Sequence, residues 1–447
     1  MITAIINVFV TLFQRLAIWG EGLYSLGYLI IGGIGAYASG GVGGFLAKAT
    51  SQRRVFALLR GFWPNLSLSR VIMKCYDNTG TAVLTRRADV IDVLNRNDDF
   101  EVVYGPRMRQ LTQGDNFFLG MQPGWDYTRD TSAMRLAARM TDVSEIVLPR
   151  AATRANRIVA DSGGQIDIVP ALTLEVPWDM TATYFGCGAT RDEMQQWTSS
   201  LFWYLFQDLG ADTEKGAIAL GHAAQLRDYL DDHIAARKAN PTDAPDILNR
   251  CLALQSSGTP GMDDLGIRNN LLGLLIGAIP TISKATCLAL DELLNRPKAL
   301  ATAQKAARAD DDALLAQHCW EALRFNPFNP VIYRRATRDT QVAASTLRRV
   351  KIRKGQIVFA VNASASFDRF DICEPNVFHT DRPWDSYMIW GYGMHNCFGD
   401  KINQAVIPAI LKPLLLQQNL RRAPGGAGQI STGHFGFPDH FHIAFDT

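Results

Sequence analysis

The chain has 447 residues, enough to bury a large core, and we expect one catalytic domain preceded by a short N-terminal segment. Its 45 basic and 43 acidic side chains give a net charge of +2, which excludes nucleic acid as a partner held by a general positive field. Seven scattered cysteines, an odd number, argue against a disulfide framework and indicate a reducing compartment.

The N-terminal segment, residues 1–49, contains a long stretch without charge. Gly22 to Ala47 carries no charged residue, and this length is sufficient to cross the ~30 Å hydrocarbon core of a bilayer. Lys48 and Arg53 come after it, and basic residues after a span hold the following domain on the cytoplasmic side. We therefore predict a membrane-anchored protein with its catalytic domain, residues 50–447, in the cytoplasm. A soluble cytoplasmic protein whose leader packs on the domain is the alternative, because the stretch is rich in Gly, Ala and Ser.

Two pairs of side chains further along the chain have helical spacing. Trp125 and Arg129 are four residues apart, and Glu321 and Arg324 are three apart, so each pair would share one face of a helix. Taken alone, each pattern is typical of an ordinary solvated helix surface. Between them, Asn270 to Leu294 is a long apolar stretch that predicts one buried helix.

The most informative stretch lies near the C-terminus and reads Trp390-Gly-Tyr-Gly-Met-His-Asn-Cys-Phe-Gly399. Its one thiol, Cys397, has no second cysteine at zinc-ligand or disulfide spacing, so a site here uses a single sulfur. Gly391, Gly393 and Gly399 remove side chains that would collide with a flat porphyrin, and they let backbone N–H groups approach the sulfur. A buried apolar cysteine in a glycine-rich turn is the simpler interpretation, but the spacing favours haem iron bound by Cys397.

The pattern Gly391-x-Gly393-x-His395-x-Cys397-x-Gly399 resembles the proximal loop of the cytochrome P-450 family, in which the first position is normally Phe and here is Trp390. The resemblance covers about residues 60 to 447. It implies a mainly α-helical, triangular domain with small β-sheets, which holds haem b between a long distal helix and the cysteine loop. It also implies the Cys397 thiolate as the axial ligand of the iron, with the aromatic ring of Trp390 packed beneath the haem.

The resemblance extends to a charged network. Glu321 and Arg324 match the family's buried Glu-x-x-Arg pair, and Arg382 matches a third charged group of the same network. In the family this network braces the cysteine loop. The resemblance therefore implies that these three side chains are structural and buried.

Further residues are expected at the haem carboxylates. Arg334 begins a predicted strand with Arg335, and because neighbouring strand residues face opposite ways, only one of them is directed at a propionate. The family match favours Arg334. Trp125 and Arg129 match the family's Trp-x-x-x-Arg helix, which faces the propionates, and His395 is placed to hydrogen-bond a haem carboxylate.

The long apolar helix matches the distal helix with one departure. Family members that reduce dioxygen usually carry an acid followed by Thr at its centre, whereas this chain reads Gly277-Ala-Ile-Pro280-Thr281. The acid that would feed protons to dioxygen has thus become proline. Pro280 is expected to open the helix at the carbonyl of Ile276, so that Thr281 relays protons through water. Lys284 is a candidate to grip a substrate carboxylate, although a solvated or ion-paired lysine is the simpler interpretation.

We predict a haem-thiolate monooxygenase, an oxidoreductase that inserts one oxygen atom into a hydrophobic small molecule such as a fatty acid or another lipid. An external reductase or ferredoxin is expected to supply electrons. The lost acid favours, as the alternative, a peroxygenase or a lipid-hydroperoxide-rearranging enzyme that needs no redox partner. A non-catalytic haem-thiolate binding or sensor protein is the alternative of another class.

Overall fold

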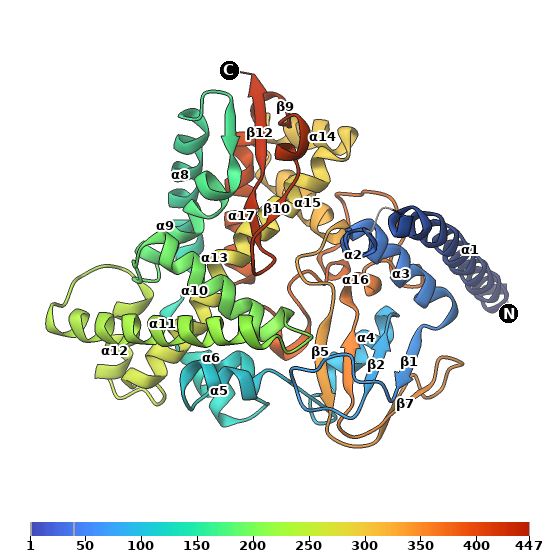
Figure 1. The fold of residues 1–447 in the computed structure, drawn as a ribbon, viewed down its shortest axis with the longest axis horizontal. Helices are drawn as coiled ribbons and strands as arrows, with labels where there is room; N and C mark the ends of the chain where they lie inside the picture. Colours follow the sequence, from blue (N-terminus) through green and yellow to red (C-terminus); the bar gives the residue numbers. More distant parts are fainter. Residues whose placement is uncertain (1, 39–40, 447) are drawn as a thin grey trace. The chain divides into compact units, whose positions relative to one another are not determined.

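The structure is a computed structural model that describes residues 2–38 and 41–446, with side chains from Val10 onward. The chain divides into two compact units (Figure 1). Unit 1 comprises residues 1–101 and 320–396, and unit 2 comprises residues 102–319 and 397–447. The predicted boundary between residues 49 and 50 does not coincide with this division and stays a prediction.

Unit 1 is built on a five-stranded sheet with strand order β1-β2-β8-β5-β3. Its centre is β8, whose sequence Ile-Val-Phe-Ala is buried throughout and pairs parallel with β2 and antiparallel with β5. Apolar residues of β8 and of its two neighbouring strands pack with those of helix α4 and form the core of the unit. The strands are β1 (Asn65–Leu68), β2 (Thr81–Leu84), β3 (Phe100–Glu101), β5 (Ile332–Ala336) and β8 (Ile357–Ala360), with a separate pair β6 (Thr340–Val342) and β7 (Val350–Ile352).

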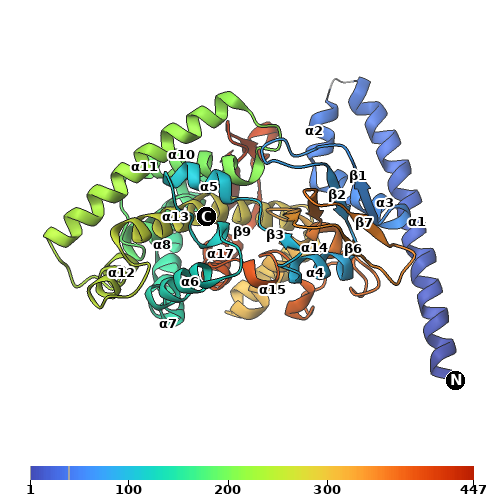
Figure 2. The ribbon, with the colours of Figure 1, turned by 90° about the horizontal axis from the view of Figure 1, so that it is seen from below.

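Unit 1 also contains helices, several of which form the N-terminal part of the chain. Figures 1 and 2 show α1 and α3 side by side, and Figure 2 shows the N-terminal end of α1 extending beyond the β-strands of the same unit. The helical elements are α1 (Ile2–Ala38), α2 (Val42–Ala47), α3 (Ala49–Phe62), α4 (Arg87–Asn95), α16 (Asn362–Ala365), η5 (Trp384–Ser386) and η6 (Gly393–His395). Helix α15 (Asp312–Phe325) begins in unit 2 and ends in unit 1.

The predicted membrane span does not form one continuous helix. Helix α1 ends at Ala38 and α2 begins at Val42, while residues 39 and 40 of the predicted span lie outside the described residues. At the start of the span, the carboxylate of Glu21 accepts hydrogen bonds from Arg369 at 2.5 Å and Asn376 at 2.7 Å. Ion pairing with Arg60 at 3.6 Å adds to these contacts. Helix α1 is therefore fixed to the rest of unit 1, as the alternative of a packed leader requires.

Unit 2 is helical and surrounds the long helix α13 (Asp264–Leu294). The side chain of Asp263 accepts a hydrogen bond from the N–H of Gly266 at 2.7 Å and caps the start of this helix. Among the described residues, α13 is the one helix long and apolar enough to cross a membrane, and 67% of its most apolar window is buried. Leu271, Leu272 and Leu275 are fully buried, which is the environment of a core helix.

Helices pack around α13, and small sheets complete unit 2. The helices α9, α10, α11 and α17 contact α13 directly.

One sheet of unit 2 has the order β4-β12-β9, and a second pairs β10 with β11. The strands are β4 (Gln165–Asp167), β9 (Gln418–Arg422), β10 (Ser431–Thr432), β11 (Pro438–His440) and β12 (His442–Asp446). The α-helices other than α13 and α15 are α5 (Gly105–Thr112), α6 (Trp125–Ala137), α7 (Met140–Asp142), α8 (Leu148–Ala160), α9 (Glu175–Thr183), α10 (Arg191–Phe202), α11 (Thr213–Ala239), α12 (Ile247–Ser256), α14 (Pro297–Arg308) and α17 (Asp400–Leu415). Short helical turns are η1 (Phe118–Gly120), η2 (Val143–Val147), η3 (Val169–Thr173), η4 (Trp203–Gln207) and η7 (Gly425–Gly428).

Candidate functional site

The sulfur of Cys397 lies just before the N-terminus of helix α17, in unit 2. Burial raises the pKa of the Cys397 thiol to about 11 and the charge of Asp400 acts in the same direction, while the N–H of Gly399 and the charge of Arg135 act against them. The side-chain amide of Asn403 donates to the sulfur at 3.9 Å. The start of a helix also favours a negative charge. These groups are the surroundings that a metal-bound thiolate requires.

Arg135 of helix α6 braces the cysteine loop from the side. Its Nη1 donates to the carbonyl oxygen of Phe398 at 2.9 Å, and its guanidinium lies 3.9 Å from the centre of the Phe398 ring. The ring of Phe118 packs against the same phenylalanine, with centroids 4.9 Å apart. The residue next to the thiol is thus held by a hydrogen bond, a cation–π contact and an aromatic contact.

The donor set around Cys397 fits haem iron better than a zinc site. Within residues 2–38 and 41–446, Cys397 belongs to no group of three or more side chains that could hold a metal ion. A structural zinc site needs four protein ligands, whereas haem needs one axial ligand from the protein. A single sulfur with N–H donors directed at it therefore fits the one axial ligand that haem iron needs from the protein.

The first half of the loop belongs to unit 1. Gly391 and Gly393 have φ angles of +86° and +73°, a backbone conformation that favours glycine. A Cβ at Gly393 would lie 3.0 Å from the carbonyl oxygen of Leu94. His395 ends the helical turn η6 and is half-buried. The glycines are therefore required by the loop's own turns as well as by the flat group predicted beside them.

Trp390 packs in a cluster of three indole rings. Its ring meets that of Trp320 edge to face at 5.0 Å and stacks on that of Trp384 at 5.4 Å. The sequence predicted this ring beneath the haem and gave no sign of the two partners. Because its partners are also large aromatic rings, a Trp in place of the usual Phe is accommodated by packing at this position.

The predicted charged network is assembled in unit 1. Arg324 makes two hydrogen bonds to the carboxylate of Glu321, at 2.7 and 2.9 Å, and Arg382 adds a third at 3.1 Å. The backbone N–H of His379 donates to the same carboxylate at 2.9 Å. The side chains of Glu321 and Arg324 are fully buried, and that of Arg382 is 5% exposed.

This network fixes the segment that leads into the cysteine loop. Arg324 also donates to the carbonyl of Ser366, and Arg382 donates to the carbonyls of Cys373, Glu374 and Val377. Burial alone would raise the pKa of Glu321, but hydrogen bonds from Arg324 and the charges of both arginines outweigh it and hold the pKa below its ordinary value. The carboxylate is therefore charged and holds several backbone turns together.

The two arginines of β5 face opposite ways, as the strand pattern predicted. Arg334 is 2% exposed and its Nη1 donates to the carbonyl of Tyr333 at 2.9 Å. Arg335 instead bonds the carboxylate of Glu101 on the neighbouring strand at 2.6 Å. Arg334 is thus the buried member of the pair, the one assigned to a propionate.

On helix α6 Trp125 faces solvent and Arg129 pairs with acidic side chains, and their predicted role at the haem carboxylates stays a prediction. Trp125 is 71% exposed. The guanidinium of Arg129 forms ion pairs with Asp130 at 2.7 Å and Asp126 at 3.1 Å on its own helix. The cause is local, because carboxylates one and three residues away compete for the guanidinium. The arginine of this helix that reaches the cysteine loop is Arg135, which the sequence analysis did not single out.

The distal helix α13 continues through Pro280 as one helix. Because proline has no N–H, the carbonyl of Ile276 lacks its donor from residue 280, and the water held there stays a prediction. The hydroxyl of Thr281 donates to the carbonyl of Gly277 and, at 3.2 Å, to that of Ala278. These bonds go to the carbonyls next to that of Ile276, which is the carbonyl that lacks the donor of residue 280. A Cβ at Gly277 would meet no atom within 4 Å, so there is open space on the helix face that it shares with Thr281 and, one turn further, Lys284.

Lys284 lies in a largely apolar setting within unit 2. Its Nζ donates to the carbonyl of Gly436 at 3.3 Å and lies 5.3 Å from the centre of the Phe437 ring. Burial lowers the pKa of Lys284 to about 8. The ammonium is thus held beside the hairpin of β10 and β11, facing an aromatic ring.

Comparison with known proteins agrees with the site. The Cytochrome P450 family model matches residues 72–431. A steroid C26-monooxygenase of Mycobacterium tuberculosis (strain CDC 1551 / Oshkosh) is 26% identical over 262 residues, or 58% of this chain and 65% of that protein. The 7,8-linoleate diol synthase of Pyricularia oryzae is 39% identical over 85 residues, or 19% of this chain and 7% of that protein. The chain thus spans less than two thirds of the length of these curated relatives.

Solved structures share the fold. The ligand-free structure of cytochrome P450 TbtJ1 superposes with a TM-score of 0.72 at 20% identity, over 90% of this chain and 98% of that one. P450BioI in complex with a hexadec-9Z-enoic acid ligated acyl carrier protein gives 0.73 at 16% identity, over 89% and 98%. These likenesses confirm the predicted mainly helical fold with small sheets. The predicted enzyme class, an oxidoreductase of the monooxygenase kind, agrees with the family whose model matches. Because that model covers well over half of the sequence, the chain belongs to the cytochrome P450 family.

Proposed function

We propose that the protein is a haem-thiolate monooxygenase that inserts one oxygen atom into a hydrophobic small molecule, with electrons from a separate reductase or ferredoxin. The observation that carries the proposal is the single sulfur of Cys397, with N–H donors from Gly399 and Asn403 directed at it. Haem bound there supplies the iron at which the O–O bond is cleaved and oxygen is transferred.

The residues around Cys397 have a definable task. Burial and the charge of Asp400 favour the protonated thiol, whereas the Gly399 N–H, the Arg135 charge and the helix start favour the thiolate. Cys397 would hold haem iron as the thiolate, and the N–H donors would limit how much electron density the sulfur gives away. Arg334 and His395 are the residues of the chain that we assign to the haem carboxylates.

Proton delivery on the distal side falls to Thr281. The side chain of Pro280 carries no exchangeable proton, so it cannot replace the acid of related dioxygen-reducing enzymes. The Thr281 hydroxyl, hydrogen-bonded to its own helix, is a weaker donor to the reacting oxygen. We therefore expect a dioxygen-dependent reaction in which many electrons are lost to side reactions.

The experiment that tests this function supplies linoleic acid with NADPH and a surrogate ferredoxin system, or with hydrogen peroxide and no reductant. A monooxygenase gives hydroxylated product only with the reductant, and Pro280→Asp then raises the share of electrons recovered in product. Thr281→Val, which removes the hydroxyl and keeps the side-chain volume, lowers that share further. If neither oxidant yields product from a protein that holds haem, the non-catalytic sensor becomes the better account.

A second candidate function is the rearrangement or use of a lipid hydroperoxide without a redox partner. Pro280 favours it, because a substrate whose O–O bond is already reduced needs no relay of two protons. The names of two relatives from Pyricularia oryzae, the linoleate diol synthase and a bifunctional dioxygenase-epoxy alcohol synthase that is 30% identical over 135 residues and covered to 12%, support a lipid as the substrate. Consumption of a linoleate hydroperoxide in the absence of any reductase would support this candidate over the first.

Lys284 supports an acidic lipid as the substrate of either reaction. Lys284 lies on the same face of α13 as Gly277 and Thr281, where there is open space at Gly277, and the apolar setting of its ammonium strengthens its attraction to a carboxylate. The matched variants are Lys284→Met, which keeps the length without charge, and Lys284→Arg. We expect Lys284→Met to weaken binding of linoleic acid more than that of the corresponding alcohol, and Lys284→Arg to preserve the preference.

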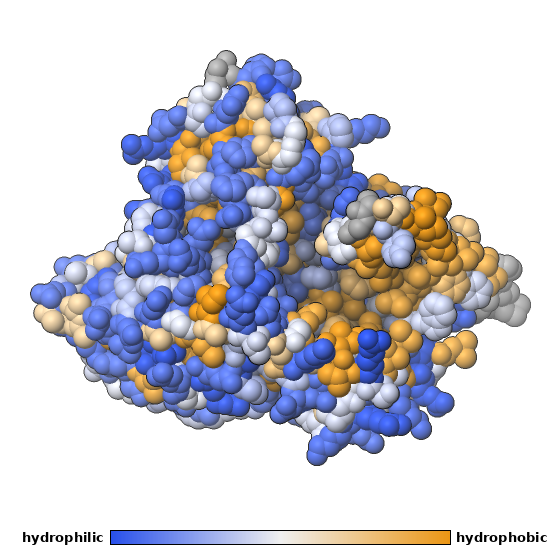
Figure 3. All heavy atoms as spheres, viewed as in Figure 1, coloured by the Kyte–Doolittle hydropathy of each residue, from blue (hydrophilic) through white to orange (hydrophobic). Residues whose placement is uncertain are grey.

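We also propose that the N-terminal segment attaches the protein to a membrane. Helix α1 buries Ile18 and Ser25, while the opposite side exposes apolar side chains that Figure 3 shows gathered over this part of unit 1. This apolar stripe consists of Phe13, Leu16, Leu23, Ile30, Ile31, Ile34 and Tyr37, each at least 52% exposed. Such a stripe suits a helix lying against lipid. Full-length protein should pellet with lipid vesicles, and Phe13→Ser with Ile34→Ser should reduce the pelleted fraction.

A further inference from the structure

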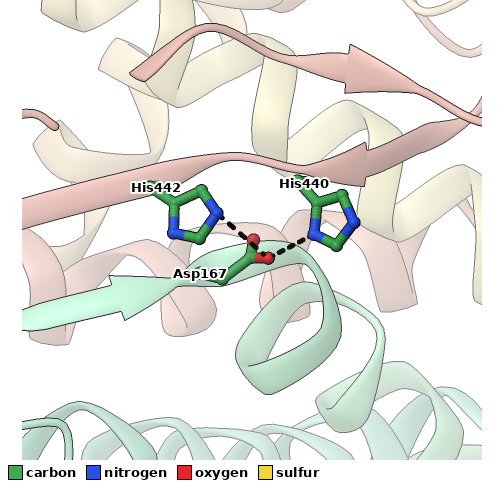
Figure 4. A group of neighbouring side chains, drawn as sticks. All are labelled: Asp167, His440 and His442. Carbon is green, nitrogen blue, oxygen red and sulfur yellow. Dashed lines mark hydrogen bonds and ion pairs between the residues drawn. The ribbon is translucent and has the colours of Figure 1, made fainter. Parts of the chain in front are cut away.

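Three potential metal ligands meet in unit 2, where the C-terminal strand β12 pairs with β4 (Figure 4). Asp167 ends β4, His440 ends β11 and His442 begins β12. His442 stands directly opposite Asp167 in the antiparallel pairing of β12 with β4. His440 and His442 are two residues apart, so they point to the same side, while Phe441 between them is fully buried on the other side.

The carboxylate of Asp167 is oriented before any ligand binds. Its Oδ1 accepts hydrogen bonds from the backbone N–H groups of Phe441 at 2.9 Å and Val169 at 3.3 Å. This leaves Oδ2 facing the imidazoles, 2.5 Å from Nδ1 of His440 and 3.6 Å from Nε2 of His442. The two rings are nearly parallel, with centroids 6.1 Å apart. Backbone contacts of this kind fix the direction of a metal-ligating carboxylate.

The distances between the donor atoms suit a small dication. The three ligand atoms all lie within 4.8 Å of one another. In a tetrahedral zinc site two ligands at about 2.0–2.2 Å from the ion lie about 3.3–3.6 Å apart, so side-chain rotations that move the imidazole nitrogens by about 1 Å would close the site. His440 and His442 are 58% and 44% exposed and can make that adjustment.

We propose that Asp167, His440 and His442 form a binding site for a transition-metal dication of the zinc class, with water completing the coordination. Two imidazoles with one carboxylate select such ions over Mg²⁺ and Ca²⁺, which take oxygen ligands. The competing arrangement is the plain His–Asp ion pair. Because both imidazoles are about half exposed, solvent screens this pair and a metal ion displaces it at little cost.

The surrounding charge does not oppose a cation. Arg154 and Arg157 lie on the neighbouring helix α8 and line the same groove as Asp167. Arg154 is paired with Glu175, and Arg157 with Asp161 at 3.7 Å. Each of these two guanidiniums thus has a carboxylate partner, and Glu175 is shared with Arg191 at 3.2 Å.

Metal binding at this position would act on the hairpin of β10 and β11. His440 is the last residue of that hairpin, which also carries Gly436 and Phe437 against Lys284 of the distal helix. An ion shared with Asp167 of β4 would tie the base of the hairpin to the body of unit 2. We expect the metal to order residues 431–440 next to Lys284.

The test uses the full-length haem protein, purified without a histidine tag, freed of metal with a chelator and titrated with zinc chloride in a calorimeter. The expected result is one tight site per chain, weakened at least tenfold in His442→Gln and in Asp167→Asn. Asp167→Asn keeps an amide oxygen for the two backbone N–H donors, so it separates loss of a ligand from loss of folding. His434→Gln, an exposed histidine of the same hairpin, is the matched control and should bind zinc as the wild type does.

Hydrogen exchange provides a second readout that does not depend on activity. Zinc should slow amide exchange in residues 431–440 of the wild-type protein and leave it unchanged in His442→Gln. The proposal is overturned if the wild type shows no stoichiometric site. It is also overturned if His442→Gln and Asp167→Asn bind zinc as tightly as the wild type, because the bound ion would then be held elsewhere, for example at the exposed thiol of Cys373.

Discussion

Replacing Glu321 by Gln removes the charge at the centre of the buried network. The carboxylate accepts three hydrogen bonds from two arginines and one from the backbone of His379. Because Arg324 is fully buried, the variant leaves a guanidinium without its counter-charge in a site that water does not reach. Breaking a buried pair in this way costs about 3–5 kcal/mol.

The change in melting temperature follows from the size of the chain. An unfolding entropy of about 2.1 cal/mol/K per residue gives ~0.9 kcal/mol/K for 447 residues melting as one unit, so Glu321→Gln should lower Tm by about 3–5 °C. The matched control is Glu374→Gln. That side chain is 63% exposed and pairs only with His379 among the ion pairs of the described residues, so we expect a change below about 0.5 kcal/mol.

The assay is thermal unfolding followed by circular dichroism, with haem absorbance recorded in parallel. Because the folded-state pKa of Glu321 is depressed, its contribution is present above the unfolded carboxyl pKa of about 4.3 and is lost as pH falls through the lower folded value. The Tm difference between wild type and Glu321→Gln should therefore narrow below about pH 4. If Glu321→Gln melts within about 1 °C of the wild type at pH 7, the network does not brace the fold as argued.

Two further substitutions test the cysteine loop. Gly393→Ala forces a residue with a side chain into φ +73° and brings its Cβ to 3.0 Å from the Leu94 carbonyl, so it should destabilise the protein by about 1–3 kcal/mol in chemical denaturation. Gly399→Ala, at φ −88° with its nearest neighbours 4.0 Å away, should cost less than half as much, and equal costs would contradict the role of backbone conformation. Arg135→Gln loses the hydrogen bond and ring contact to Phe398 and a positive charge near the thiol, so haem should transfer to apomyoglobin several-fold faster than from the wild type. An unchanged transfer rate would show that Arg135 does not hold the loop.

The family, the fold and the charged network were predictable because their signals are local. Cys397 with its flanking glycines lies within ten residues, and Glu321 and Arg324 are one helical turn apart. Such spacing is visible in the sequence, but the Glu321 and Arg324 pair alone is typical of a solvated helix surface, and only the family pattern predicted that it is buried. Arg382 needed the family pattern in addition, because its contact with Glu321 joins residues 61 positions apart.

The remaining features depend on contacts that no local pattern indicates. Glu21 is held by Arg369, which is 348 residues away, so no local pattern indicates that helix α1 is fixed to unit 1. Asp167 and His440, 273 residues apart, come together only through the pairing of β4 with the C-terminal strands. Arg129 matched a family motif, but its guanidinium forms an ion pair with the carboxylate of the adjacent Asp130, which the motif does not indicate. Arg135 belongs to none of the motifs that the sequence analysis recognised.

The central claim is that Cys397 binds haem iron through its thiolate. The most direct measurement is the carbon monoxide difference spectrum of the reduced full-length protein, compared between wild type and Cys397→Ala. The account predicts the strongly red-shifted Soret band of a thiolate-ligated complex in the wild type and its absence in Cys397→Ala. A wild-type protein that binds haem without this band, or a Cys397→Ala variant that retains it, would contradict the account.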